Sequence, residues 1–202
     1  MHQEVFEPAS HNSHAYEFAG AIINPGDFVI DAGACEGFFT RYALQRNARV
    51  LALEPVFRLT EALGHTFEAE IVNGQVEVFC AALGARSEQA RLYTEQNHLY
   101  ESRIGGTGPE IQVRALDEIS GEKRIDFIKM DIEGSEMDAV LGASQTIARQ
   151  KPRLAIAVYH GLENAHQVCY FLREIRPDYQ IIHRGIYAWD GCEPRPLMVY
   201  AW

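Results

Sequence analysis

A glycine loop between an apolar run and an amphipathic segment is the part of this chain best suited to hold a cofactor. The run Phe28–Asp31 leads directly into the loop, whose residues are Ala32, Gly33, Ala34, Cys35, Glu36 and Gly37. Glycine has no Cβ, so the backbone can turn sharply at Gly33 and Gly37 and approach a ligand closely. A helix that follows such a loop points free N–H groups at the ligand. We therefore predict a cofactor cradle with Asp31 at its edge.

A carboxylate on the next apolar run indicates that the cofactor carries a ribose. Val50–Glu54 ends 54 − 33 = 21 positions after the first glycine, which is the spacing of a ribose-binding acid in dinucleotide folds. The Gly-x-x-x-Gly loop nevertheless differs from the Gly-x-Gly-x-x-Gly fingerprint of those folds. Glu54 is predicted to accept hydrogen bonds from both ribose hydroxyls. The small residues Cys80, Ala81 and Ala82 suit the neighbourhood of an adenine, and a plain core strand is the alternative interpretation.

A second group of polar residues could act on a bound substrate. Asp131 and Glu133 follow the apolar run Ile125–Asp131, and His160 directly follows the run Leu154–Tyr159. Because ligands of open parallel sheets bind beyond the carboxyl ends of the strands, these side chains should face the same site. His160 is the first candidate for a general base and Asp131 is the second. The competing interpretation is a cap for the helix that begins near Ser135.

A metal ion is a further interpretation of the same acidic residues. Asp131 and Glu133, with Asp138 nearby, are carboxylates of the kind that holds a magnesium ion. The sequence offers no additional set of ligands around them. We therefore expect no metal at this site.

Short apolar runs that alternate with amphipathic segments define the fold class. The pattern predicts an α/β protein with a mostly parallel seven-stranded sheet and helices on both faces. The first five strands are expected at Phe28–Asp31, Val50–Glu54, Val76–Ala81, Ile125–Asp131 and Leu154–Tyr159. Tyr179–His183 and Leu197–Tyr200 follow each other without a helical pattern between them, so they should pair as antiparallel neighbours. This layout is typical of class I methyltransferases, whose fold is Rossmann-like.

The whole chain, residues 1–202, is predicted to be one domain, to which the segments outside the main strands also belong. Residues 1–26 are predicted to be an N-terminal helical segment, with a helix over Ser13–Ile23, and Ser135–Gln150 is predicted to be one continuous helix. Residues 84–114 interrupt the alternation, and there Ala90–Thr94 is expected to pair with Ile111–Arg114. This insertion is interpreted either as a surface excursion or as a flap over the substrate.

Composition limits the partners. The chain has 202 residues, of which 47% are hydrophobic, and its formal net charge is −10, which disfavours nucleic acid and anionic membranes. Its four cysteines have no Cys-x-x-Cys spacing, which is typical of a reducing compartment. Met1–Glu7 lacks the pattern of a secretory signal, and no run is long enough to cross a bilayer. We expect a cytoplasmic protein that binds a small neutral or cationic molecule.

These motifs together resemble the FkbM family of S-adenosylmethionine-dependent methyltransferases. The resemblance covers about residues 26–185 and is most specific over Asp126–Glu136. It is also carried by the loop Asp31–Gly37, by Glu54-Pro55, by Arg114–Glu118 and by Lys151–Leu154. Cys35 stands where the family commonly has Asn.

The resemblance implies methyl transfer from S-adenosylmethionine to a hydroxyl oxygen, typically of a sugar, a polyketide or a related secondary metabolite. It also implies cofactor contacts from residues of the matching motifs, which are Asp31, Gly33, Ala34, Cys35, Glu36, Gly37, Glu54, Pro55, Asp131 and Glu133. The small residues Ala81 and Ala82, at the end of the third strand, complete the expected cofactor contacts. Because the segment before the first strand is short, the acceptor pocket is expected to be either open or completed by a second subunit of a homo-oligomer. A nucleotide-dependent oxidoreductase and a non-catalytic S-adenosylmethionine-binding module are the alternative functions.

Overall fold

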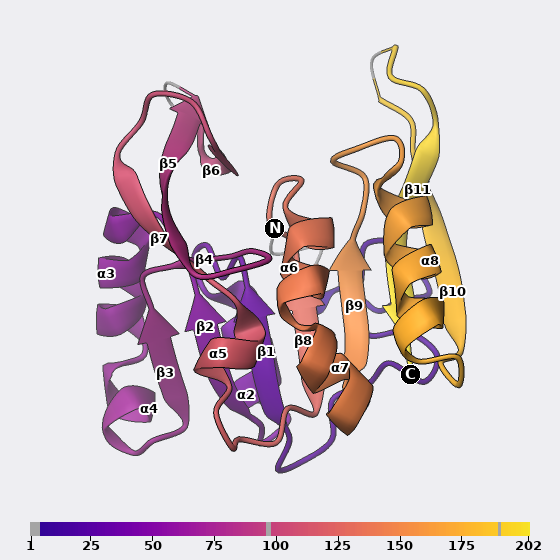
Figure 1. Ribbon diagram of the computed structural model, residues 1–202. Coiled ribbons are helices and arrows are strands. Elements are labelled where there is room, and N and C mark those ends of the chain that lie inside the picture. Colours follow the sequence, from indigo (N-terminus) through magenta and orange to yellow (C-terminus); the bar gives the residue numbers. More distant parts are fainter. Residues whose placement is uncertain (1–4, 96–97, 190) are drawn as a thin grey trace.

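A seven-stranded sheet forms the centre of the computed structural model, which describes residues 5–95, 98–189 and 191–202 (Figure 1). The strand order is β10-β11-β9-β8-β1-β2-β3, and β11 alone runs opposite to the other six strands of this sheet. This confirms the predicted sheet and its antiparallel C-terminal strand. The strands span Phe28–Ala32 (β1), Arg49–Leu53 (β2), Val76–Phe79 (β3), Phe127–Met130 (β8), Arg153–Ala157 (β9), Ile181–Tyr187 (β10) and Arg195–Ala201 (β11).

Helices cover both faces of this sheet because the central strands are apolar on both sides. In Figure 1, α5 to α8 lie in front of the sheet, and α2 lies behind it. The front face buries Val140, Ile147 and Leu172, and the rear face buries Phe39 and Phe67. Among the described residues, no helix combines the length and apolar character needed to cross a membrane. The helices span Phe38–Leu44 (α2), Phe57–Thr66 (α3), Glu68–Val72 (α4), Leu116–Ile119 (α5), Glu136–Gly142 (α6), Ser144–Gln150 (α7) and Asn164–Ile175 (α8).

The helix predicted over Ser135–Gln150 is broken into α6 and α7 at Ala143, so the prediction of one continuous helix is wrong. The carboxylate of Asp117 accepts hydrogen bonds from the backbone N–H groups of Gln145 (2.9 Å) and Thr146 (2.7 Å). A side chain from another helix thus satisfies the first N–H groups of α7, which an unbroken helix would bond internally. Periodicity within one segment does not reveal a cap that comes from 28 residues away.

The helix predicted over Ser13–Ile23 is also wrong. This segment is irregular and contains an isolated bridge between Phe18 and Ala21. Its residues are held by tertiary contacts instead of helical hydrogen bonds: Tyr200 donates its hydroxyl to the carbonyl of Ala15, and a Cβ at Gly20 would overlap the Trp202 ring. Residues 1–4 of the predicted N-terminal helical segment lie outside the described residues.

A second sheet, of four strands, rises beyond the carboxyl ends of the parallel strands (Figure 1). The predicted pairing is confirmed only in part: Ala90 lies opposite Ile111 in an antiparallel ladder, but from Leu92 onward this strand pairs with β6. An apolar cluster that includes Val56 and Leu92 joins this sheet to the main body. Residues 96 and 97 of the predicted flap lie outside the described residues. The strands, in the order β4-β7-β5-β6, span Ala82–Leu83 (β4), Glu88–Glu95 (β5), His98–Ile104 (β6) and Glu110–Arg114 (β7).

Candidate active site

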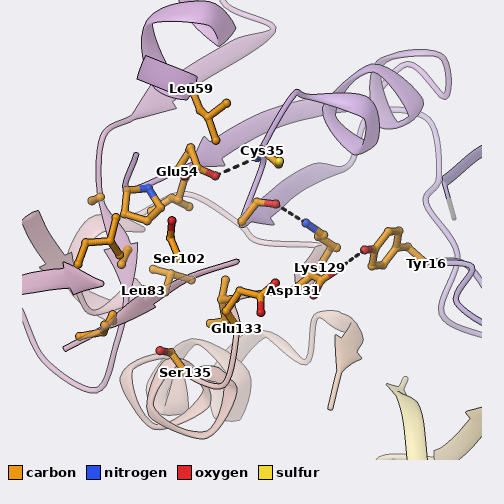
Figure 2. A pocket seen from close by; sticks show the side chains of 18 residues that line it. Tyr16, Cys35, Glu54, Leu59, Leu83, Ser102, Lys129, Asp131, Glu133 and Ser135 are labelled. Atoms are coloured by element: carbon orange, nitrogen blue, oxygen red, sulfur yellow. Dashed lines mark hydrogen bonds between the residues drawn. The ribbon is translucent and has the colours of Figure 1, made fainter. Parts of the chain in front are cut away.

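A cavity lies at the carboxyl ends of the central strands, where an open α/β sheet binds its ligands (Figure 2). It encloses about 720 Å³ with its open mouth included, within the range of small-molecule sites. Eight of the predicted site residues line it, namely Gly33, Cys35, Glu54, Pro55, Ala81, Ala82, Asp131 and Glu133. The lining also includes Tyr16, Leu53, Leu59, Leu83, Leu92, Ser102, Ile104, Lys129, Ile132 and Ser135, most of which the sequence did not indicate.

The glycine loop is pressed against the neighbouring strand end. Gly33 has φ 75°, and a Cβ there would lie 2.0 Å from the carbonyl oxygen of Asp131, so this position requires glycine. The backbone N–H groups of Gly33 and Ala34 both donate to the carbonyl of Leu53. The backbone of Cys35 is also left-handed, with φ 50°, and its N–H donates to Glu54. Backbone hydrogen bonds therefore fix the loop beside the cavity.

Three residues of the loop lie outside the cavity lining. Ala34, Glu36 and Gly37 do not line it, which differs from their prediction as cofactor contacts. Gly37 has φ 82° and stands at the start of α2, where a Cβ would lie 2.5 Å from the Phe67 ring and 2.8 Å from Leu63. The absence of a side chain at Gly37 thus lets α2 begin against α3.

Glu54 has the position expected of a ribose-binding acid. Its carboxylate lines the cavity, although the residue is only 5% exposed. One oxygen accepts the N–H of Cys35 and the other accepts the N–H of Val56, each at 2.9 Å. Burial raises its pKa more than these two hydrogen bonds and the charge of Lys129 lower it. A carboxylate oxygen can accept more than one hydrogen bond, so both oxygens keep capacity for a ligand hydroxyl.

Small and apolar side chains form the wall next to Glu54. Ala81 and Ala82 are buried and line the cavity as predicted, with Leu83 beside them. Leu92 and Ile104, from the four-stranded sheet, face the same space. Such a wall can contact the face of a planar base.

Asp31 lies beneath the loop instead of at the edge of the cavity. It is fully buried and is not among the lining residues, so the structure does not support its prediction as a direct cofactor contact. Its carboxylate lies 3.1 Å from Nζ of Lys129 and accepts the hydroxyl of Thr40 at 2.7 Å. Lys129 also donates to the carbonyls of Ala32 (3.1 Å) and Gly33 (2.7 Å). This buried pair therefore supports the loop from below.

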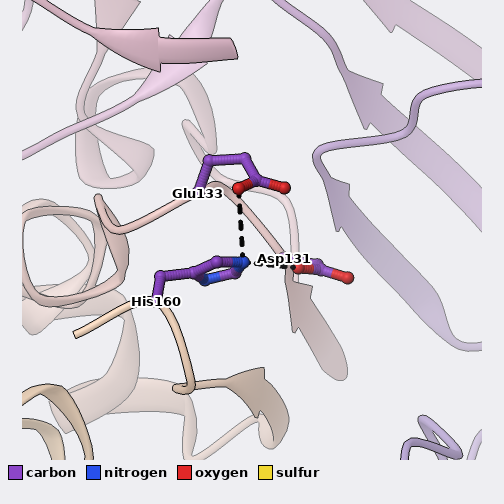
Figure 3. A group of neighbouring side chains, drawn as sticks. All are labelled: Asp131, Glu133 and His160. Carbon is purple, nitrogen blue, oxygen red and sulfur yellow. Dashed lines mark ion pairs between the residues drawn. The ribbon is translucent and has the colours of Figure 1, made fainter. Parts of the chain in front are cut away.

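Asp131, Glu133 and His160 meet at the opposite wall of the cavity, as predicted from the strand ends (Figure 3). Nε2 of His160 lies 3.5 Å from Oδ1 of Asp131 and 3.5 Å from Oε2 of Glu133. The imidazole is only 3% exposed and stands behind the two carboxylates, so His160 does not itself line the cavity. Burial alone would lower the pKa of His160, but the hydrogen bond and charge of Glu136 and the charges of Asp131 and Glu133 raise it.

Glu136 holds this group in place and was missed as a site residue. It is fully buried, and its carboxylate lies 2.9 Å from Nδ1 of His160. The same carboxylate accepts a hydrogen bond from Nδ2 of Asn164 at 2.6 Å. It also accepts hydrogen bonds from the backbone N–H groups of Ile132 and Gly134, both at 3.2 Å. The sequence presented Glu136 only as part of a possible helix cap. Two of its partners, His160 and Asn164, are more than 20 residues away, and sequence spacing does not show them.

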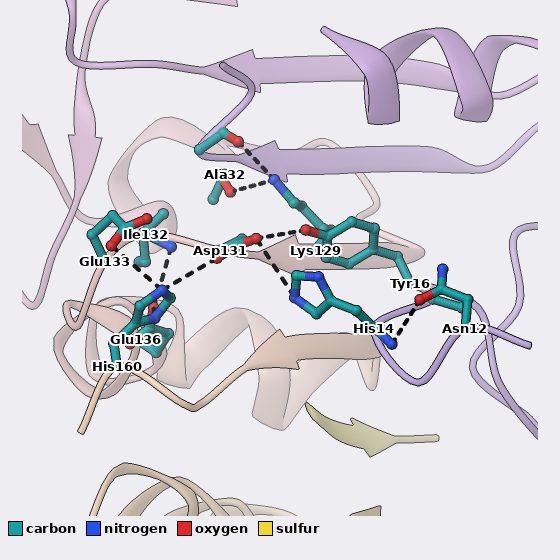
Figure 4. A network of polar contacts seen from close by, with 12 residues as sticks. Asn12, His14, Tyr16, Ala32, Lys129, Asp131, Ile132, Glu133, Glu136 and His160 are labelled. Atoms are coloured by element: carbon teal, nitrogen blue, oxygen red, sulfur yellow. Dashed lines mark hydrogen bonds and ion pairs between the residues drawn. The ribbon is translucent and has the colours of Figure 1, made fainter. Parts of the chain in front are cut away.

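The N-terminal segment completes the wall from the other side (Figure 4). The hydroxyl of Tyr16 donates to Oδ2 of Asp131 at 2.5 Å, and Nε2 of His14 lies 3.8 Å from the same oxygen. Asp131 is thus placed between the N-terminal segment and His160. No motif surrounds Tyr16 or His14, so the sequence carried no signal for this contact.

The strand order with its antiparallel strand, together with a cavity at the carboxyl ends of the parallel strands, defines the class I methyltransferase fold. The fold is shared by fibrillarin from Aeropyrum pernix, whose structure holds S-adenosyl-L-methionine; the TM-score is 0.53 and the identity 12%, over 89% of this chain and 67% of that one.

Residues 31–179 match the methyltransferase FkbM domain, and the chain belongs to this family. It is similar to the crystal structure of a methyltransferase FkbM from Methylobacillus flagellatus, with a TM-score of 0.73 and 25% identity, over 100% of this chain and 49% of that one.

Two curated relatives extend the comparison. The chain is 24% identical to the AMB antimetabolite synthetase AmbE of Pseudomonas aeruginosa, over 82% of this chain and 10% of that protein. It is 27% identical to Methyltransferase 1 of Beauveria bassiana, over 57% of each. The chain therefore spans only part of each of these relatives.

Proposed function

We propose that this protein transfers a methyl group from S-adenosylmethionine to a hydroxyl oxygen of a small molecule, in the class of sugars and secondary metabolites. One observation carries the proposal. A single cavity joins the buried carboxylate of Glu54, which suits a ribose, to the carboxylates of Asp131 and Glu133, which suit a reacting hydroxyl. The family of the chain supports methyl transfer as the reaction.

The residues present fit this cofactor. Glu54 would accept the ribose hydroxyls, the wall of Ala81 and Ala82 would contact the adenine, and the loop at Gly33 and Cys35 would lie along the methionine part. When bound, the cofactor supplies a methyl carbon activated by a positive sulfur, and sulfur keeps the electron pair of the broken carbon–sulfur bond. The tight approach of Gly33 to Asp131 brings the cofactor side and the substrate side together.

The acceptor would lie against Asp131 and Glu133. Its hydroxyl oxygen forms the new bond to the methyl carbon, and its proton leaves toward the cluster of Asp131, Glu133 and His160. Alignment of the two reactants supplies much of the rate, and assistance in removing the proton adds typically 10²–10⁴-fold. Tyr16 and Glu136 hold Asp131 and His160 in position for this step.

Two observations support a neutral or cationic small molecule as acceptor. The chain has a formal net charge of −10, and three carboxylates surround His160 within the wall, so an anionic acceptor would be repelled. The relative AmbE is described as an antimetabolite synthetase, which supports a secondary metabolite. We also propose a cytoplasmic location, and a homo-oligomer remains a prediction.

Binding of S-adenosylhomocysteine, measured by isothermal titration beside NAD, tests the cofactor. We expect binding of the first compound and none of the second, with a lower affinity for the 2′-deoxy analogue of S-adenosylhomocysteine. In Glu54→Gln the preference for the ribose hydroxyl should be lost. Glu61→Gln, an exposed glutamate on α3, is the matched control. Binding of NAD alone would contradict the proposal.

Methyl transfer itself requires a screen of hydroxylated acceptors with the labelled cofactor, followed by mass spectrometry of the product. The expected product is a methyl ether. Tight cofactor binding without transfer to any acceptor would favour a non-catalytic binding module instead.

A further inference from the structure

The cluster at the cavity wall has the ligand set of a metal site. Asp131, Glu133 and His160 each offer one ligand atom, and these atoms all lie within 4.8 Å of one another. The two carboxylates line the cavity and the imidazole stands behind them. The sequence had suggested Asp138 as the partner of the two acids, but the structure brings His160 to them instead.

The buried imidazole provides a second and independent observation. Its Nε2 atom and Oδ1 of Asp131 are both buried without a hydrogen-bond partner among the described residues. Because Nδ1 of His160 lies 2.9 Å from the Glu136 carboxylate, the proton of a neutral ring belongs on Nδ1. The lone pair of Nε2 then points at two carboxylate oxygens 3.5 Å away, an arrangement that a cation between them would stabilise.

The surroundings of His160 are those of a metal-binding histidine. Such residues almost always donate their second ring N–H to a carboxylate or carbonyl, which fixes the tautomer and the orientation of the ring. Glu136 fulfils this function and is itself held by Asn164 at 2.6 Å. The left-handed backbone of Glu133, with φ 56°, is a conformation that L residues seldom adopt and that often marks a functional site.

The buried cation Lys129 is bound mainly to other groups. It is 4% exposed, its ammonium group contacts Asp31 and the carbonyls of Ala32 and Gly33, and it acts on Asp131 only through its charge. Arg103, on the four-stranded sheet, is exposed and acts on Glu133 only through its charge. Asp131 and Glu133 therefore keep their attraction for a cation that reaches them from the cavity.

We propose that Asp131, Glu133 and His160 bind one divalent cation of the manganese type beside the acceptor. Two carboxylate oxygens and one imidazole nitrogen form a mixed ligand set. Such a set favours Mn²⁺ over Ca²⁺, because Ca²⁺ takes oxygen ligands only. The inference rests on the proposed methyl transfer for its purpose: the cation would bind the acceptor oxygen and lower the pKa of its hydroxyl. The proton would then leave to solvent, with His160 serving as a ligand rather than as the base.

Titration of the full chain with Mn²⁺, followed by electron paramagnetic resonance of the free ion, tests the site directly. We expect one bound Mn²⁺ per chain. Binding should be lost in Asp131→Asn and His160→Ala, and it should weaken by about 10–100-fold in Glu136→Gln, which keeps all three proposed ligands but weakens the support of the histidine. The exposed residues His166 and Glu163, at the start of α8, give the matched controls His166→Ala and Glu163→Gln, which should bind as the wild type does.

The cofactor titration separates this inference from the proposed function. S-adenosylhomocysteine should bind equally well with and without EDTA, whereas methyl transfer should stop in EDTA and return when Mn²⁺ is added. If S-adenosylhomocysteine binds and Mn²⁺ does not, the metal site is refuted and His160 is a positively charged ring held by its carboxylates. Unchanged Mn²⁺ binding in His160→Ala would refute the site as well.

Discussion

The two walls of the cavity are built in different ways. The wall proposed for the cofactor comes from neighbouring strand ends: the backbone N–H of Gly33 donates to the carbonyl of Leu53, and the backbone N–H of Cys35 donates to the Glu54 carboxylate. The wall proposed for the acceptor comes from distant segments, and Tyr16, Asp131 and His160 meet through their side chains. The first wall therefore depends on the path of the chain, and the second depends on individual side chains.

This difference makes the cofactor wall a fixed part of the sheet and leaves the acceptor wall open to change by substitution. A backbone-built wall is fixed by the sheet, so it suits a ligand that many proteins share. A wall built from side chains can be altered by single substitutions without disturbing the sheet, so it suits an acceptor that differs between relatives. Substitutions in and beneath the cofactor wall should accordingly affect stability, whereas substitutions in the acceptor wall should affect turnover.

The largest effect is expected beneath the cofactor wall, in Asp31→Asn. The substitution leaves the buried ammonium of Lys129 without its charged partner, and such a loss costs about 3–5 kcal/mol. Urea denaturation should show this loss in the free energy of unfolding. The double variant Asp31→Leu with Lys129→Met should recover part of it, because no unpaired charge remains.

The exposed pair Arg86–Glu88 provides the matched control, since Glu88→Gln should change the free energy of unfolding by less than about 1 kcal/mol. If Asp31→Asn kept its stability and lost only affinity for S-adenosylhomocysteine, then Asp31 would be a direct contact. The original sequence interpretation would be correct in that case.

The second effect concerns Glu54 and the affinity for S-adenosylhomocysteine. Hydrogen bonds to a charged group contribute about 1.5–3 kcal/mol each. Loss of both ribose contacts in Glu54→Ala should therefore weaken binding by on the order of 100-fold or more. Thermal denaturation would show whether the variant still folds, because Glu54 also accepts the N–H groups of Cys35 and Val56.

The same carboxylate predicts how binding depends on pH. Burial holds the pKa of Glu54 above its ordinary value, and ribose hydroxyls require the ionised form as acceptor. Affinity should therefore be full above this raised pKa and should fall as the pH drops through it, at a higher pH than for an ordinary glutamate. Titrations over a pH series would measure this fall, and it should be absent in Glu54→Gln. An equal fall in both proteins would contradict the assignment.

The contrast between the walls also explains what the sequence could predict. The apolar runs predicted a mostly parallel sheet whose last two strands are antiparallel, and the spacing from Gly33 predicted Glu54, because both depend on neighbouring residues. Tyr16 was not predicted, because its segment resembled a helix until its tertiary contacts were known. Asp117 was missed as the residue that begins α7, since it acts across space.

A smaller effect is expected in the acceptor wall from Tyr16→Phe. The substitution removes the hydrogen bond to Oδ2 of Asp131 but keeps the ring in place. A hydrogen bond to a carboxylate contributes about 1.5 kcal/mol, which corresponds to roughly a tenfold change in rate. We therefore expect kcat to fall by about this factor. The affinity for S-adenosylhomocysteine should stay the same. Tyr42→Phe is the control, because that hydroxyl donates to Glu17 outside the cavity lining; an equal loss of kcat there would contradict the prediction.

The smallest effect is expected when the cofactor product S-adenosylhomocysteine binds, on the rate at which a thiol reagent modifies Cys35. Cys35 is buried in the loop, and its burial together with the neighbouring Glu36 raises the pKa of its thiol. Burial also raises the pKa of the Cys169 thiol, to about 11. A thiol reagent at pH 8 should therefore modify the exposed Cys80 and Cys192 at least about tenfold faster than either buried cysteine. Because the wall is preformed, S-adenosylhomocysteine should change the slow rate of Cys35 by less than about twofold. Single-cysteine variants followed by mass spectrometry would measure each rate. Rapid modification of Cys35 that the ligand suppresses would mean instead that the loop opens in the free protein and that the cofactor orders it.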